Sequence, residues 1–427
     1  MHQLAAKLFP ISRSITGQGF RDSLVILDNE LGNIMKFHEI KSGEAVFDWI
    51  VPDEWNVKDA YIITPDGRKI CDFKQNNLHL LGYSQPIHAK LSLDELSKHL
   101  YSLPNKPDAV PYVTSYYKKR WGFCISQNER KTLKDGIYEV FIDSTHDKNG
   151  VLNYADFIIP ASNNTNDEIL ISTYLCHPSM ANNELSGPVV ATHLAKWLRE
   201  RERERVKLKY NYRFVFIPET IGSIIYLSRN LTHLQKHVKA GFNLSCVGDD
   251  LAYSLIHTPN ANTLADKAAM HVLKDKPNFK EYDFLDSGSD ERQYCSPLIN
   301  LPVCGICRSK YGEYESYHTS NDDLNFISQK GLEGSLNAMC EIIKTLEINA
   351  VYKNTVFCEP NLGKRGLYPT LSTTTNDKST YYYRKFLALC DGKRDCIDIA
   401  NRLNIKAYEL ENVVQKLLEN GLISDEI

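Results

Sequence analysis

One histidine and one carboxylate stand in a short polar loop between an apolar run and a pattern of helical spacing. The stretch STYLCHPSMANNELSGPVVATHLAKWL, residues 172–198, carries His177 and Glu184 in that loop. Imidazole nitrogens and carboxylate oxygens bind borderline metal ions such as zinc. The alternative is a carboxylate that only caps the following helix. The positions of the other histidines and carboxylates in the chain distinguish a metal site from a helix cap.

Three further clusters also follow apolar runs that predict buried strands. Glu219 follows FVFIP, and Asp249 and Asp250 follow FNLSCVG. His318 lies in YHTSNDDL, beyond VCGICRS. The carboxyl ends of parallel strands share one edge of an open α/β sheet, where ligands bind. We therefore expect these residues to converge on one site, where a carboxylate takes a proton from a metal-bound water.

The elements that must position these residues alternate between strand and helix from about residue 167 onward. Apolar strands are predicted in EILISTYLC, YRFVFIPE, AGFNLSCVG and LPVCGICRS, with helices between and after them. This order predicts an α/β fold with a mostly parallel sheet flanked by helices. We assign residues 1–44 and 158–355 to this domain.

Two regions have a different residue pattern. Residues 45–157 contain strands broken by Pro-Asp turns, which predicts an inserted all-β domain. Residues 356–427 predict three helices with helix-turn-helix spacing and resemble a winged-helix domain, with GLI at the start of the wing. Its recognition-like segment KAYELENVVQKLLENG has no arginine to read guanine or hold phosphates. We expect no nucleic-acid partner and a role in protein contact, including homo-oligomer formation.

Composition limits the class of protein. The 427 residues have a formal net charge of −3, so no basic surplus indicates nucleic acid. No apolar run is long enough to span a membrane, and the N-terminus lacks a signal peptide's features. Cys304 and Cys307 have metal or redox spacing, but their apolar surroundings favour buried strand thiols. We expect a reduced, cytoplasmic protein.

Together, the motifs resemble the co-catalytic zinc aminopeptidases, whose fold is also found in the transferrin receptor and glutaminyl cyclase. The matching segments are HPS, ANNELSG, PETIGS, GSDE and YHTSNDDL, which cover the α/β half of the chain. The whole chain also resembles a bacterial and archaeal family that joins three parts. These are a peptidase-like domain, an inserted protease-associated-type β domain and a C-terminal winged helix. RSITGQGFR and GSDERQYCSP carry this second resemblance.

The sequence departs from the aminopeptidase pattern at several ligand positions. The family's His-x-Asp motif reads His-Pro-Ser here, and its bridging aspartate falls on Asn183, a poor metal ligand. Its paired glutamates fall on Glu219 and Thr220, so the proton-accepting residue is kept and a ligand is lost. The next aspartate falls on Ser245, unless a neighbouring aspartate replaces it. The resemblance therefore implies one zinc ion per chain rather than two.

A mononuclear site has three protein ligands and an open position for water. The ligands implied by the resemblance are His177, Glu184 and His318, with Asn183 and Asp250 as alternatives. Glu219 would act as the general base.

The segment GSDERQ supplies candidates for substrate binding. Asp290, Glu291 and Arg292 would line the pocket, with the arginine suited to a carboxylate, and Tyr311 is a further candidate. A charged turn that caps a helix is the alternative for this segment.

Two functions follow. The first is a zinc-dependent hydrolase that cleaves a peptide or other amide bond in a small substrate. The second is a catalytically degenerate ligand-binding protein that uses its winged helix to contact DNA or another protein.

Overall fold

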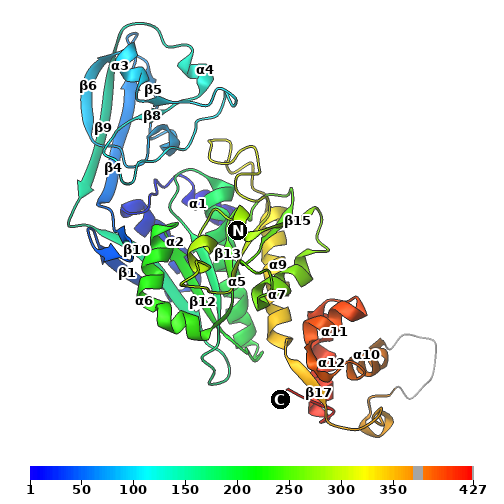
Figure 1. The fold of residues 1–427 in the computed structure, drawn as a ribbon. Coiled ribbons are helices and arrows are strands. Elements are labelled where there is room, and N and C mark those ends of the chain that lie inside the picture. Colours follow the sequence, from blue (N-terminus) through cyan, green and yellow to red (C-terminus); the bar gives the residue numbers. More distant parts are fainter. Residues whose placement is uncertain (369–377, 426–427) are drawn as a thin grey trace. The chain divides into compact units, whose positions relative to one another are not determined.

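The computed structural model describes residues 1–368 and 378–425, and its largest sheet has eight strands (Figure 1). In spatial order they are β1 (Lys36–Lys41), β10 (Val151–Ile159), β12 (Asn211–Ile217), β11 (Glu168–Tyr174), β13 (Val238–Leu244), β16 (Val303–Cys307), β14 (Tyr253–Ile256) and β15 (Phe279–Tyr282). The four central strands β12, β11, β13 and β16 run parallel. Strands β10 and β14 pair antiparallel to them on either side. The predicted α/β class is confirmed.

The central strands are buried on both faces because their side chains are mostly apolar. Every residue of β11 and of β16 is buried, as expected for parallel strands covered by helices. The charged pair Glu168 and Arg213 is buried between β11 and β12, with Nε 2.6 Å from Oε2. The strands therefore form a rigid base whose carboxyl ends carry the polar loops.

Helices flank this sheet, among them α2 (Gln18–Leu31), α5 (Ser186–Arg203) and α6 (Ile221–His237) (Figure 1). Helix α5 approaches the strands closely at Gly187, where a side chain would collide with the carbonyl oxygen of Leu244. The glycine thus lets the start of α5 pack against the ends of β11 and β13. Within the described residues, no helix is both long enough and apolar enough to cross a membrane.

A smaller sheet forms the inserted module. Its strand order is β5 (Lys69–Ile70), β4 (Glu54–Ile63), β9 (Ile137–Asp147) and β6 (Ile87–Ser92). A short hairpin, β2 (Ala45–Val46) and β3 (Trp49–Ile50), precedes it. Strand β10, most of which lies within the predicted range 45–157 of this module, instead pairs with β1 and β12 in the main sheet. Most of its side chains are buried, which fits the large sheet better than an edge of the small one.

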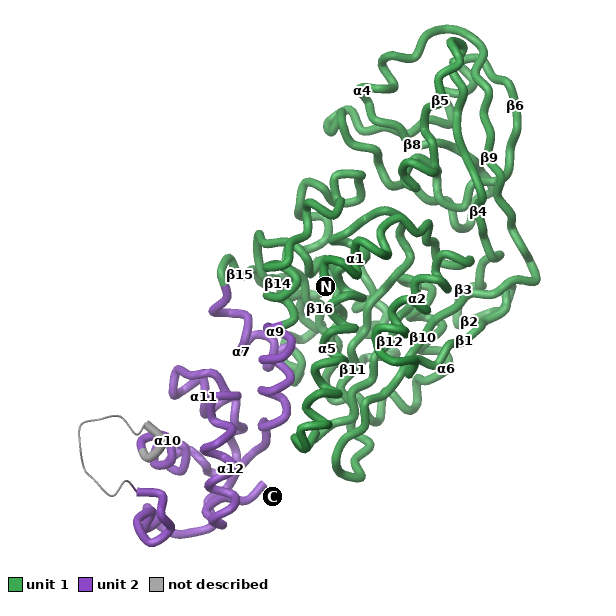
Figure 2. Tube along the Cα trace, turned by 180° about the vertical axis from the view of Figure 1, so that it is seen from behind, with its two compact units in different colours: residues 1–265, 277–336 green, residues 266–276, 337–427 purple. Residues whose placement is uncertain are grey.

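The described residues within 266–276 and 337–425 form a second compact unit, shown in purple in Figure 2. It contains the three predicted C-terminal helices, α10 (Lys378–Leu387), α11 (Cys396–Leu403) and α12 (Glu411–Glu419). A three-stranded sheet accompanies them, in the order β18 (Asp391–Asp395), β17 (Val351–Asn354) and β19 (Ile423–Ser424). Strand β19 lies where the wing is predicted.

Helices α7 (Leu264–Leu273) and α9 (Gln329–Ile348) each contain residues of both units, and both lie where the sequence predicts helices. None of the eleven cysteines, all of which lie in the described part of the chain, forms a disulfide, and Cys304 and Cys307 are buried in β16.

Candidate metal and catalytic site

Three loops after parallel strands bring polar side chains to one cavity. His177 follows β11, Glu219 follows β12, and His318 lies in the loop beyond β16. All three line a cavity of about 380 Å³. Its other walls are largely aromatic and aliphatic, from Ile15, Trp49, Tyr112, Tyr116, Tyr117 and Ile221. The cavity therefore holds two imidazoles and one carboxylate in surroundings that exclude much of the water.

His177 is fixed from behind by Glu184. The Nδ1 atom of His177 lies 2.7 Å from Oε2 of Glu184, and both side chains are buried. Oxygen Oε1 of Glu184 accepts hydrogen bonds from the backbone N–H groups of Cys176 and His177. Burial alone would lower the pKa of His177, but the neighbouring carboxylate more than offsets it, so the pKa is raised. The atom left for the cavity is Nε2.

Glu184 reaches this position from a π-helical turn, Ala181–Leu185, directly before α5. Three backbone N–H groups of that turn, those of residues 181–183, donate to the carboxylate of Asp322. Asp322 also accepts from the Tyr314 hydroxyl at 3.0 Å. The turn is thereby tied to the loop that carries His318.

Glu219 faces the open nitrogen of His177. Its Oε2 lies 3.7 Å from Nε2 of His177, and its Oε1 accepts a hydrogen bond of 2.7 Å from the Ser289 hydroxyl. Burial raises the pKa of Glu219 to about 7, although His177 and Ser289 act in the opposite direction. A carboxyl group that titrates near neutrality is suited to accept and return a proton.

His318 presents a buried nitrogen without a partner. Its Nε2 makes no hydrogen bond to any residue that the structure describes. Burial, with His177 nearby, lowers the pKa of His318 to about 3, so the ring is neutral at physiological pH. Tyr317 stacks on the ring at 3.9 Å, and the Tyr112 ring meets it edge-on at 5.1 Å. A fixed, neutral and unpartnered imidazole is what a metal ligand requires.

Asp290 supports the loop of Glu219 rather than lining the cavity. Thr220 has a φ of 63°, and its N–H donates to Asp290 Oδ1 at 2.7 Å. The Ser223 hydroxyl donates to the same oxygen at 2.7 Å. Burial raises the pKa of Asp290 well above its ordinary value, and Glu219 adds to this effect. Asp290 thus holds a strained turn that aims Glu219 into the cavity.

The other predicted substrate-binding residues lie beside the cavity's lining or away from it. Glu291 is buried and accepts hydrogen bonds from the Tyr311 hydroxyl and from Asn243. Arg292 is exposed to solvent. Glu291 therefore binds the Tyr311 hydroxyl and the backbone N–H of Ser289, outside the lining of the cavity.

The alternative ligands Asn183 and Asp250 are also placed outside the cavity's lining. The side-chain amide of Asn183 donates to the Tyr174 hydroxyl at 3.0 Å. Asp250 is exposed and accepts from Ser328 at 2.8 Å, whereas its neighbour Asp249 is buried.

Two arrangements could hold a metal ion. The ligand atoms of Cys176, His177 and Glu184 lie within 4.8 Å of one another, and His318 is not part of that group. Burial, together with the carboxylates of Glu184 and Glu219, raises the pKa of Cys176 strongly, which opposes formation of a thiolate before a metal ion binds. The second arrangement uses the cavity, where Nε2 of His177 lies 3.7 Å from Glu219 and the ring centroids of His177 and His318 lie 5.4 Å apart. The ligand atoms of these three residues do not all lie within 4.8 Å of one another. The chemistry of the donors favours the cavity.

Comparison with known proteins places the chain in a family. The model described as Domain of unknown function (DUF4910) matches residues 2–349. The chain belongs to the DUF4910 family. A winged helix-turn-helix model matches residues 350–425, which confirms the predicted C-terminal winged helix.

Relatives of this DUF4910 protein carry peptidase names. A Clostridium acetobutylicum protein, named as a candidate polysaccharide biosynthesis protein with an aminopeptidase-like domain, is 44% identical over 99% of this chain and 95% of its own length. A crystal structure of a peptidase candidate from the same organism has a TM-score of 0.89 and 41% identity, and the match covers 99% of this chain and 95% of that one.

More distant structures share the fold. A zinc aminopeptidase from Bacillus subtilis has a TM-score of 0.57 at 14% identity, over 81% of this chain and 93% of that one. An M28 peptidase precursor from Shewanella amazonensis has a TM-score of 0.57 at 11% identity, over 84% and 94%. The predicted resemblance to the zinc-aminopeptidase fold is confirmed.

Several residues of the DUF4910 site were not singled out from the sequence. Cys176 stands directly before His177, and Asp322 lies in the same YHTSNDDL segment as His318, so adjacency was a usable signal. Tyr112 and Tyr116 come from the inserted module and share a hydrogen bond of 2.7 Å between their hydroxyls. No spacing in the sequence connects those tyrosines to the strands of the main sheet.

Proposed function

We propose that this DUF4910 protein hydrolyses an amide or peptide bond with the help of one zinc ion. One observation carries the proposal. Glu219, with a pKa of about 7, lies 3.7 Å from the free nitrogen of His177 in a cavity lined by a second free imidazole, His318. This pairing combines a proton acceptor with two imidazole nitrogens that can bind a metal ion, as metal-assisted hydrolases do.

The residues present offer two nitrogen ligands to a zinc ion. The buried Nε2 of His318 is without a partner among the described residues, and Nε2 of His177 is left for the cavity. These two atoms would hold the ion, one protein ligand fewer than the three of typical catalytic zinc sites, and Glu184 would keep the His177 ring oriented through Nδ1. When bound, zinc supplies Lewis acidity that polarises the amide carbonyl and lowers the pKa of water.

The chain's own groups divide the remaining work. Glu219 takes a proton from the attacking water and returns it to the departing nitrogen, and the Ser289 hydroxyl holds its other oxygen in place. The aromatic walls from the inserted module exclude bulk water, which strengthens the electrostatic interactions inside. Tyr112 packs against both histidine rings, at 4.7 and 5.1 Å between centroids, and restricts their movement.

The names of the relatives narrow the substrate. A peptidase-like fold and a polysaccharide-biosynthesis name are both consistent with a small amide-containing molecule, either a peptide or an acylated amino sugar. We infer that the substrate is of this class.

Replacement of Glu219 tests the proposal. Glu219→Gln keeps the shape of the side chain but removes the base, so amide hydrolysis should fall by about 10² to 10⁴. Zinc content, measured by mass spectrometry, should not change. The exposed Glu204, at the end of α5, provides a matched control as Glu204→Gln.

Three results would count against the mechanism. Unchanged turnover in Glu219→Gln would exclude Glu219 as the base. A parallel loss of zinc would make Glu219 a ligand instead. If the zinc-loaded wild type hydrolyses no member of a panel of peptides and N-acyl amino sugars, the degenerate ligand-binding function would be favoured.

A further inference from the structure

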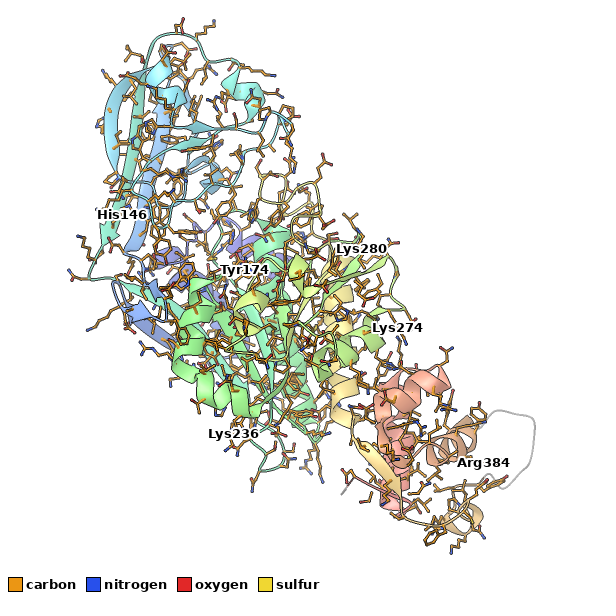
Figure 3. The ribbon with its side chains drawn as sticks, in the orientation of Figure 1. His146, Tyr174, Lys236, Lys274, Lys280 and Arg384 are labelled. Atoms are coloured by element: carbon orange, nitrogen blue, oxygen red, sulfur yellow. The ribbon has the colours of Figure 1, made fainter. Side chains whose placement is uncertain are left out.

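A second cavity, of about 460 Å³, shares a wall with the catalytic cavity. Tyr116 and Tyr117 line both cavities. The second cavity is also lined by His146, near the end of β9 at the base of the inserted module, which is labelled in Figure 3. Neither the zinc site nor the proposed chemistry uses this space.

The charges around the second cavity are mainly positive. Lys118, Lys119 and Lys148 line it, and Asp53 is its single acidic residue. In the part of the chain that the structure describes, none of the three lysines forms an ion pair. They are exposed, so their ammonium groups are free to move toward a ligand. A concave wall with three unpaired cations attracts an anion and raises its local concentration.

The shared wall is built from fixed aromatic side chains. The Tyr116 hydroxyl bonds to the Tyr112 hydroxyl at 2.7 Å, and its ring meets Tyr83 edge-on at 5.2 Å. The Tyr117 hydroxyl donates to the carbonyl oxygen of Ile50 at 3.3 Å, and its ring contacts Trp49. The lysines and Glu219 thus line neighbouring cavities that have these two tyrosines in common.

We propose that the second cavity binds an anionic group, a phosphate or a carboxylate, on the substrate whose amide bond is cleaved at Glu219. The inference rests on the proposed function and narrows its substrate class to acidic amides. Lysines act as mobile point charges and do not impose the bidentate geometry that arginine gives, so either anion fits. Specificity would then come from charge in one cavity and from the amide in the other.

Matched pairs of probes test the inference on the full-length, zinc-loaded protein. One pair is N-acetylglucosamine 6-phosphate and N-acetylglucosamine, and the other is N-acetylglutamate and N-acetylglutamine, which carries one carboxylate fewer. Binding is measured by calorimetry. We expect the more negatively charged member of at least one pair to bind about tenfold more tightly, as modest contributions from three cations give. The two pairs distinguish phosphate from carboxylate.

Two triple variants of equal charge separate the cavity from the overall charge of the protein. In K118A/K119A/K148A the preference should disappear while the zinc content stays the same. In K98A/K131A/K134A, which removes three exposed lysines of the module outside the cavity's lining, the preference should remain. The preference of the wild type should also weaken as salt increases.

The results that overturn the inference are distinct from failure of the hydrolase. The inference is overturned if the two members of each pair bind equally well, and also if none of the four probes binds. Persistence of the preference in K118A/K119A/K148A does so as well, because the anion would then bind elsewhere, for example at the zinc ion. A preserved charge preference without any hydrolysis would contradict the proposed function but support the anion site.

Discussion

Glu184 touches His177 on the side that faces away from the catalytic cavity. The contact is 2.7 Å long and involves Nδ1, so the carboxylate and the cavity lie at different nitrogens of the same ring. From the sequence, both residues are predicted to be ligands of one zinc ion. The geometry instead favours Glu184 as the residue that orients His177, a role in which a carboxylate fixes the tautomer and raises the basicity of the ring.

Glu184→Gln should weaken zinc binding by about 10- to 100-fold, as is typical when such an orienting carboxylate is lost. The amide can still accept hydrogen bonds from the backbone of residues 176–177, so the fold should persist. Competition with a chelator of known affinity measures the change. Glu200→Gln, an exposed position on the same helix, is the control. A complete loss of zinc would show that Glu184 is itself a ligand.

The two possible metal positions differ in their dependence on Cys176 and His318. Wild-type protein reconstituted with zinc should hold about one ion per chain. Cys176→Ala should keep that ion, because Cys176 Sγ lies 3.3 Å from Nδ1 of His177, whereas the cavity site uses Nε2. His318→Asn should lose it, and asparagine tolerates the φ of 55° found at this position.

Mass spectrometry of the dialysed proteins decides between these positions. The reverse pattern, with loss of zinc in Cys176→Ala alone, would place the ion among Cys176, His177 and Glu184. Two tightly bound ions in the wild type would contradict the mononuclear site.

The strand ends were predictable because each parallel strand is a short apolar run followed by polar residues. That pattern located His177, Glu219 and His318 correctly after β11, β12 and β16. The direction of each side chain was not predictable. The π-helical turn before α5 changes the position of Glu184 relative to a regular helix, and no residue in ANNEL signals such a turn.

The burial of neighbouring loop residues and the boundary of the inserted module could not be predicted either. Asp249 and Asp250 are identical in type, yet one is buried against Asn182 and Ser309 while the other faces solvent. The difference in burial between the two aspartates depends on the path of the loop backbone. The predicted boundary at residue 157 differs from the sheet pairing, because the residue pattern of β10 resembles that of the preceding strands. In the structure β10 pairs with β1 and β12, which are distant in the sequence.

The winged helix should bind duplex DNA no better than a non-specific surface does. The single basic residue of α12, Lys416, forms an ion pair of 2.8 Å with Glu419, so this helix offers no free cation to phosphates. We expect dissociation constants weaker than about 10⁻⁴ M at physiological salt, at the weak end of non-specific binding. Fluorescence anisotropy with random duplexes at two salt concentrations measures this. Tight, salt-resistant binding would contradict the prediction and favour a sensor that acts on DNA.

The buried pair of Glu168 and Arg213 should make stability depend on pH. Burial raises the pKa of Glu168, but hydrogen bonds from Arg213 and His233 outweigh it and leave the pKa lowered. A carboxyl group whose pKa is lower in the folded state stabilises the protein above its unfolded pKa, near 4.3. That contribution is lost as the pH falls through the folded pKa.

Glu168→Gln should therefore destabilise the protein by about 3 kcal/mol at pH 7, since among the described carboxylates it leaves Arg213 with the 3.4 Å contact to Asp156 as its ion pair. The difference from the wild type should shrink below about pH 4, where the wild-type carboxylate also begins to be protonated. Denaturant unfolding of both proteins from pH 3 to pH 8 measures the two free energies of unfolding. Glu139→Gln, which removes an exposed glutamate paired with His88, should leave the unfolding midpoint nearly unchanged. A difference between Glu168→Gln and wild type that stays constant over this pH range would show that the charge of Glu168 does not stabilise the sheet.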